Sequence, residues 1–371
     1  MERNIGPRSQ QNLELLAKLE SLGNAGSFAD VIELGESISA RSGSAYFRGK
    51  VQLRLAQAYL HRGKPHLAKA PLAKAKRQFA AIGDAEMIVE CMALEASVAC
   101  TEQRPDALDL ASEALRACRS LRPVPNALEL AILSSVASSQ VLVGQKADAI
   151  RTFEEAIARA DPVVDMRRLA KLLGNAGIAY RELGELQKAI NCSTRAVALF
   201  ETLRDDASLA REENNLGCYL ISCGALSGAR SHLERSAHLF ELTNLQVGRG
   251  LMLLSLCELW FVEGDLGRAD AYADAALEAG TSQQEAWSVA DAQIWRGRIA
   301  ARLGDEDRAD KAFQFAVGIL EQSAMVERLL QCHAAYAEIL EEQGDMSRAY
   351  EHLRKAFDIR MGVRDDGGTA E

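Results

Sequence analysis

Apolar residues recur at helical spacing along most of this chain, in segments separated by short polar stretches around a glycine. Residues 169–180 (LAKLLGNAGIAY) show this pattern before Gly184, and residues 186–200 (LQKAINCSTRAVALF) show it again after that glycine. A helical period predicts amphipathic helices, and the glycine predicts a left-handed residue that ends the first of the two. The pattern therefore predicts helical hairpins, with essentially no strand.

These hairpins repeat with a fixed step of 40 residues. The turn glycines are Gly144, Gly184, Gly224, Gly264, Gly304 and Gly344. An alanine follows each of them by five residues, at Ala149, Ala189, Ala229, Ala269, Ala309 and Ala349. A second small residue follows by twelve, at Ala156, Ala196, Ser236, Ala276, Ala316 and Ala356. Small residues at fixed points let helices approach closely, and Asp265, Asp305 and Asp345 are placed to cap second helices.

A single hairpin cannot bury its apolar face alone, so neighbouring hairpins are expected to stack into a solenoid. Upstream the register drifts: Gly63 keeps the turn glycine, whereas the segment that contains Ala107 and Ala114 has lost it. We expect about nine hairpins, of which those in residues 12–62 are the least regular. The predicted organisation is a disordered tail at 1–10, one solenoid over 11–360 (degenerate repeats in 11–125, regular ones in 126–360), and a disordered tail at 361–371.

The chain resembles the tetratricopeptide repeat family. Gly177, Tyr180, Gly184, Ala189 and Ala196 match the five motif places of that family in one repeat, and Gly297, Gly304, Ala309 and Ala316 match four of them in a later one. The 40-residue period exceeds the common 34-residue form and is similar to that of kinesin light chains, spindle adaptors and bacterial peptide-pheromone receptors. The resemblance implies an all-α, right-handed superhelical solenoid whose first helices line a concave groove.

Composition narrows the possible partners and locations. The net charge of −9 disfavours nucleic acid as a direct partner, because phosphate binding requires a basic surface. No window approaches the ~20 apolar residues of a membrane span, and the N-terminus has no apolar signal core. The eight cysteines show no disulfide or zinc spacing and are interpreted as small buried residues. We expect a cytoplasmic protein that binds no membrane, and the Ala- and Arg-rich composition indicates a bacterial source.

Motifs of catalysis and of cofactor binding are missing from the sequence. It contains no HExxH, GxSxG, Walker or dinucleotide-binding pattern. Cys218 and Cys223 are interpreted as core residues, and His232 and His238 as surface or half-buried residues without a ligand partner. We therefore predict no catalytic residue, no metal and no cofactor.

Candidate binding residues follow from the groove that the resemblance implies. Lys171, Asn175 and Arg181 in one repeat, and Arg211, Asn214 and Asn215 in the next, take inward-pointing places. Lys171 and Arg211 are one period apart, as are Asn175 and Asn215, so stacking would align them as a ladder. Asparagine can pair with a peptide backbone, and a cation beside it can hold an acidic side chain. The alternative is that these side chains are simply solvated.

Three further residues belong to the same candidate groove. Lys50 and Arg54 take matching places in an earlier hairpin, and Trp295 takes the place of the ladder asparagines in a later one. Trp295 is a core residue or, if exposed, an anchor for a partner. The predicted function is a scaffold or adaptor that binds a protein or an extended peptide, acidic peptides included. The alternative is a peptide-sensing regulatory module whose output domain is on another chain or missing.

Overall fold

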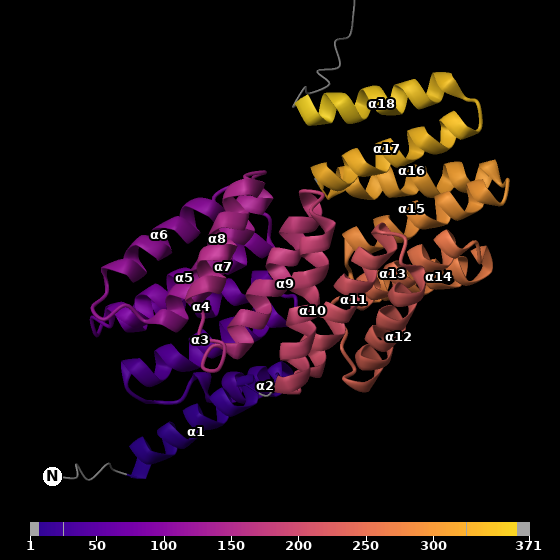
Figure 1. Cartoon of the computed structure of the whole chain (residues 1–371). Helices are drawn as coiled ribbons and strands as arrows, with labels where there is room; N and C mark the ends of the chain where they lie inside the picture. The colour runs from indigo at the N-terminus through magenta and orange to yellow at the C-terminus, as the bar shows by residue number, and fades with distance from the viewer. Residues whose placement is uncertain (1–6, 25, 324, 362–371) are drawn as a thin grey trace, which may run out of the picture. The chain divides into compact units, whose positions relative to one another are not determined.

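The computed structural model describes residues 7–24, 26–323 and 325–361, and within these residues it contains eighteen α-helices and no strand. The helices form nine antiparallel hairpins in chain order (Figure 1), as the periodicity predicts. The first four hairpins are α1 (Pro7–Asn24) with α2 (Phe28–Ser39), α3 (Ala45–His61) with α4 (Pro65–Ala80), α5 (Ala85–Thr101) with α6 (Ala107–Ser120), and α7 (Asn126–Leu142) with α8 (Lys146–Arg159). The remaining five are α9 (Met166–Glu182) with α10 (Leu186–Leu203), α11 (Asp206–Ser222) with α12 (Leu226–Leu242), α13 (Arg249–Glu263) with α14 (Leu266–Gln283), α15 (Ala286–Arg302) with α16 (Glu306–Gln322), and α17 (Val326–Glu342) with α18 (Met346–Met361).

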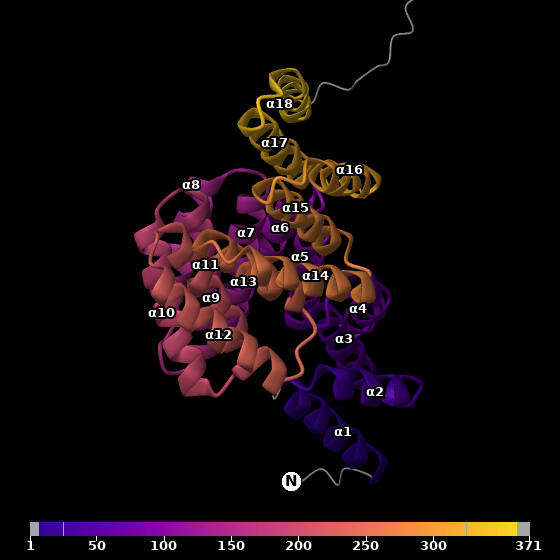
Figure 2. The same ribbon diagram turned by 90° about the vertical axis from the view of Figure 1, so that its right-hand side faces the viewer.

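The chain divides into two compact units, Met1–Ala207 and Ser208–Glu371. Unit 1 contains α1–α10 and unit 2 contains nearly all of α11–α18, and in each unit a hairpin packs against the next one along the chain. Figure 2 shows this succession for α14–α18. The single solenoid over 11–360 stays a prediction. Of the predicted tails, residues 1–6 and 362–371 lie outside the described residues, whereas residues 7–10 belong to α1 and Met361 belongs to α18.

The turn glycines end the first helices as predicted. Gly184 has a φ of +77° and Gly264 a φ of +86°, a left-handed conformation that costs glycine little because it has no Cβ. The repeat that lost its glycine keeps this conformation, with Gln103 at a φ of +53°. The predicted caps are also present: Asp265, Asp305 and Asp345 each accept a hydrogen bond from the backbone N–H three residues on, at 3.0–3.1 Å.

The small residues are packing positions. The alanines five residues after each turn glycine are all buried, and so are the small residues twelve after it. Gly217 and Gly297 show the reason for small size on the first helices. A Cβ added to Gly217 would lie 2.5 Å from Leu233, and one added to Gly297 would lie 2.7 Å from the ring of Phe313. In these two hairpins a large side chain of the second helix therefore fills the space that the glycine of the first helix leaves.

Candidate functional site

The first helices of the hairpins form the inner layer of each unit. In unit 1 the contacts run α1–α3, α3–α5, α5–α7 and α7–α9, and in unit 2 they run α13–α15 and α15–α17. Among the described residues no pair of second helices is in backbone contact. Instead, long side chains bridge them, as Arg308 does to Asp270 and Arg348 does to Asp310. A stack that is tight along one layer and spread along the other curves toward the tight layer, so we refer to the exposed surface of the first helices as the inner face.

Lys50 and Arg54 lie together on the inner face of unit 1, but carboxylates of the neighbouring first helices already pair with them. Arg54 contacts Glu20 of α1 at 2.9 Å and Glu90 of α5 at 3.5 Å, and Lys50 lies 3.6 Å from Glu20. Partial burial acts to raise the pKa of Glu20, but the hydrogen bond from Arg54 and the two positive charges hold that pKa below its usual value. The predicted basic lining is therefore a row of alternating charges in this region.

Farther along unit 1, hydroxyl and amide groups join consecutive first helices. Ser97 of α5 and Ser135 of α7 share a hydrogen bond of 3.0 Å. The side-chain amide of Asn175 on α9 donates to the hydroxyl of Ser134 at 3.2 Å. Asn175 is half-buried, whereas Lys171 and Arg181 of the same helix are exposed. The structure thus places Asn175 on the inner face, at a seam between two helices.

The α11 residues differ from the prediction at one position. Arg211 is exposed and Asn215 is half-buried, but Asn214 is buried, with 3% of its surface exposed. Asn214 precedes Asn215 by one residue, so it lies on a different side of the helix, which is packed against neighbouring helices. Leu254 occupies the same position in the next repeat. The amide of Asn214 donates a long contact of 3.9 Å to the sulfur of Cys218. The expectation that Asn214 lines the groove is therefore wrong. Lys171 belongs to unit 1 and Arg211 to unit 2, so their alignment as a ladder stays a prediction.

Trp295 is half-buried on α15 and packs against Phe261 of α13. The two rings meet edge-to-face, with centroids 5.5 Å apart. The guanidinium of Arg298 lies 5.2 Å from the centre of the Trp295 ring, and that of Arg302 lies 5.5 Å from the centre of the Phe261 ring. The structure thus adds Phe261, Arg298 and Arg302, which the sequence did not identify, to the predicted Trp295. Trp260, by contrast, is buried in the core.

Among the residues that the structure describes, no group of three or more His, Cys, Asp or Glu side chains is placed to hold a metal ion. Cys223 is exposed and Cys218 half-buried, so the expectation that both are core residues is wrong. Burial raises the pKa of Cys91, Cys257 and Cys332 to about 12, which keeps these thiols protonated. His232, interpreted as unpartnered, contacts the fully buried carboxylate of Glu213 at 2.5 Å.

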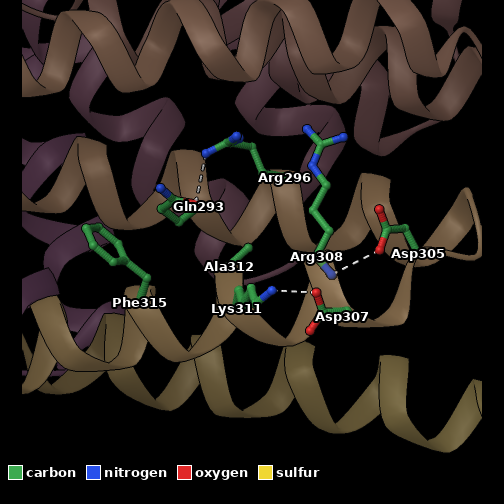
Figure 3. A pocket seen from close by; sticks show the side chains of 8 residues that line it. All are labelled: Gln293, Arg296, Asp305, Asp307, Arg308, Lys311, Ala312 and Phe315. Atoms are coloured by element: carbon green, nitrogen blue, oxygen red, sulfur yellow. Dashed lines mark hydrogen bonds and ion pairs between the residues drawn. The ribbon is translucent and has the colours of Figure 1, made fainter.

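A pocket of 390 Å³ lies at the α15–α16 hairpin (Figure 3). Gln293 and Arg296 come from α15, and the other lining residues come from α16 and the turn before it. Ala312 takes the repeat position at which Tyr272 and His352 stand in the neighbouring hairpins, so the pocket lies beside a small residue where they have a ring. Its arginines are engaged: Arg308 forms two bonds of 2.7 and 2.9 Å to Asp270, and Arg296 lies 3.0 Å from Asp274.

Comparisons with known proteins agree with this architecture. A family model described as "Tetratricopeptide repeat" matches residues 170–202, which lie in α9 and α10. The resemblance to tetratricopeptide proteins is confirmed. No helix in the described part of the chain is long and apolar enough to cross a membrane.

Solved structures share the fold over nearly the whole length. A Rap protein complexed with competence and sporulation factor aligns with a TM-score of 0.69 at 14% identity, over 96% of this chain and 99% of its own. The apo quorum sensor NprR from B. thuringiensis aligns with a TM-score of 0.64 at 14% identity, over 95% of this chain and 99% of its own. Aspartyl phosphate phosphatase F from Bacillus subtilis aligns with a TM-score of 0.63 at 13% identity, over 100% of this chain and 98% of its own. At this identity the likeness concerns the fold. A search of the curated proteins finds no match.

Proposed function

We propose that this protein is a non-enzymatic module that binds a protein or an extended peptide on the inner face of its first helices. The observation that carries the proposal is the whole-length fold match to a Rap protein complexed with competence and sporulation factor. A layer of closely spaced first helices supports it, because such a layer offers a continuous surface for an extended chain. We place the protein in the cytoplasm and assign it no metal and no cofactor.

The chemistry of the inner face suits a peptide. Amides such as those of Asn175 and Asn215 can both donate to and accept from a peptide backbone, which provides affinity that depends little on sequence. Exposed cations such as Lys171, Arg181 and Arg211 favour acidic side chains or a terminal carboxylate. Lys50 and Arg54 would contribute only if a ligand carboxylate replaced Glu20 or Glu90 as their partner.

A second candidate is a peptide-sensing regulatory module, which the whole-length fold match to the quorum sensor NprR favours. In that case the same inner face binds the signal, and the output lies on another chain or outside this sequence. The two candidates differ in the effect that ligand binding has on other proteins. A sensor changes its association with an output protein when the peptide is added, whereas an adaptor holds its partner without such a signal.

The absence of enzymatic activity is part of the proposal, although one structural neighbour is named as a phosphatase. The buried thiols are protonated at neutral pH, and a protonated thiol is neither a good nucleophile nor a good ligand. The carboxylates beside the pocket hold arginines of the protein itself. These groups are therefore occupied by structural contacts.

Peptide capture tests the proposal directly. The immobilised full chain is incubated with a native bacterial lysate, and bound peptides and proteins are eluted, identified by mass spectrometry, and retested as synthetic ligands by calorimetry. The paired variant Lys171→Glu with Asn175→Ala should lose the ligand. The control Lys188→Glu changes an exposed lysine of the second helix α10 and should retain it. Equal binding by both variants would place recognition elsewhere and contradict the proposal.

A further inference from the structure

We propose that unit 2 contains an anchoring site for a peptide segment in which an acidic group adjoins an apolar side chain. The site consists of Phe261, Trp295, Arg298 and Arg302, and we refer to these four residues as the aromatic–arginine cluster. The inference rests on the proposed function, because it assigns ligand chemistry to one part of the inner face. It adds the pairing of an acidic group with an apolar side chain, and a location that the asparagine ladder does not include.

The geometry joins an apolar platform to two positive charges. The edge-to-face pair of Phe261 and Trp295 spans the contact between α13 and α15, and each ring carries one guanidinium of α15 within 5.5 Å of its centre. A guanidinium that lies against an aromatic ring still has N–H donors at its edge, in a fork that fits a carboxylate. The cluster can therefore cover an apolar side chain with its rings while it binds an acid with its arginines.

The other repeats show that the fold does not require these side chains. The residues one or more periods away from Trp295 are Ser135, Asn175, Asn215, Ser255 and Ala335. Those that correspond to Arg298 are Ser138, Ile178, Cys218, Glu258 and Glu338. Those that correspond to Arg302 are Leu142, Glu182, Ser222, Val262 and Glu342. A hairpin of this architecture thus forms without a tryptophan or an arginine at these places, so packing alone does not account for the cluster.

Electrostatics favour an incoming carboxylate. Arg298 and Arg302 are four residues apart on one helix, an arrangement in which like charges repel each other. Arg298 has a distant carboxylate partner, Glu338 of α17, at 3.7 Å and with 72% of that side chain exposed. Arg302 is exposed and forms no ion pair with any residue that the structure describes. A ligand carboxylate would relieve the repulsion, and the contact with Glu338 shows that an acidic group can reach this helix.

Exposed apolar residues adjoin the cluster. Val262 follows Phe261 at the end of α13 and is 51% exposed, and Leu303 follows Arg302 at the end of α15 and is 57% exposed. Together with the half-buried rings they provide apolar surface that a Leu, Ile or Phe side chain of a ligand can remove from water. The preferred ligand is therefore a peptide with an Asp, a Glu or a terminal carboxylate close to such a side chain.

Selection from a random library tests this preference. A phage library of dodecapeptides is panned on the immobilised full chain, and the enriched peptides are synthesised with their acids intact or replaced by Asn and Gln. The test variant Trp295→Ser/Arg298→Ser/Arg302→Ser uses a residue that other repeats carry at these places. The matched control Tyr350→Ser/Arg354→Ser/Lys355→Ser removes an aromatic and two cations from the exposed surface of α18. Circular dichroism confirms that each variant is folded.

We expect enriched peptides to pair an acid with an apolar residue and to bind the test variant about ten- to a hundredfold more weakly, the loss expected for charge-assisted bonds. The control variant should bind them as the unchanged protein does. The single variant Arg302→Gln should lose affinity for the acidic peptides and not for their amide versions. If peptides are enriched but bind the test variant equally, the inference fails and the proposed function stands. If the unchanged protein enriches no peptide, both fail.

Discussion

The Nδ1 atom of His333 on α17 lies 2.9 Å from the Nδ1 atom of His352 on α18. Because one nitrogen must donate and the other accept, the contact requires that the two rings are not both protonated. Burial, with the charges of His352 and Lys355, lowers the pKa of His333 to about 4. Burial, followed by the charges of Lys355 and Arg348 and opposed by Glu351 and Asp310, also lowers the pKa of His352.

The last hairpin should therefore lose stability in acid. A histidine whose pKa is lowered by folding binds its proton more readily in the unfolded chain. Its contribution to the stability of the folded state is therefore complete above the unfolded pKa near 6.5 and is lost as the pH falls toward 4. Hydrogen exchange of α17 and α18, corrected for intrinsic rates, should show protection that decreases over this range. The substitution His333→Leu introduces the leucine that other repeats carry at 133, 173 and 253. It should reduce the dependence of this protection on pH. An unchanged dependence in that variant would refute the assignment.

Gly297 and Gly318 should respond oppositely to replacement by alanine. In an open helical position this change stabilises by about 1 kcal/mol, and a Cβ on Gly318 would meet nothing within 4 Å. A Cβ on Gly297 would lie 2.7 Å from the ring of Phe313, which is fully buried and stacks on Tyr336. We expect Gly297→Ala to destabilise by about 1–3 kcal/mol. Urea unfolding of both variants measures the difference, and stabilisation by both would show that the hairpin is loosely packed.

The inner-face amides should contribute to the binding of many peptides alike. For a peptide recovered by capture, Asn175→Ala with Asn215→Ala should weaken binding by about 1–3 kcal/mol without a change in helicity. Arg211→Glu should weaken it at least as much and relax the preference for acidic peptides. Binding should also weaken as salt rises, because screening acts on the charge-assisted contacts. Calorimetry at two salt concentrations measures both effects, with Lys188→Glu as the unaffected control. Salt-independent binding would exclude the cations from the interface.

Removal of one whole period should leave a folded protein. Deletion of residues 265–304 joins Gly264 to Asp305, so the new turn keeps its glycine and its capping aspartate. Arg308 then takes the place of Arg268, whose guanidinium lies 4.3 Å from the centre of the Trp260 ring. Because each hairpin contacts mainly its neighbours, we expect circular dichroism to show the same helicity per residue. Complete unfolding of this variant would contradict the solenoid architecture.

The fold was predictable where the backbone itself imposes a residue type. A left-handed turn favours glycine and a helix start favours aspartate, so Gly264 and Asp265 alone predict the turn of a hairpin. The ends of the second helices gave no such signal. Arg204, Asn244 and Gln284 are left-handed there, also one period apart, but none is a glycine. Because no glycine marks these positions, a short stretch of sequence does not reveal them.

The candidate site was less predictable, because neighbouring helices determine which side chains form ion pairs and which are exposed. The periodicity selected Asn175, Asn214 and Asn215 alike. In the structure Asn175 and Asn215 are half-buried, whereas Asn214, which lies one residue around the helix from Asn215, is buried. Charge alone suggested that Arg54 was available, whereas Glu20 and Glu90 come from hairpins before and after it. Phe261, Arg298 and Arg302 could have been found by comparing the repeats with one another, since each departs from its counterparts in residue type.

The bridges between second helices have a mechanical consequence. In unit 2 the first helices α13, α15 and α17 contact one another along their backbones, but α14, α16 and α18 are joined through Asp270 with Arg308 and Asp310 with Arg348. The first helices of unit 2 are therefore in direct contact with one another, whereas the direct links between its second helices are ion pairs, which salt weakens. The bending rigidity of this unit should decrease as ionic strength rises, while its contour length along the first helices stays constant.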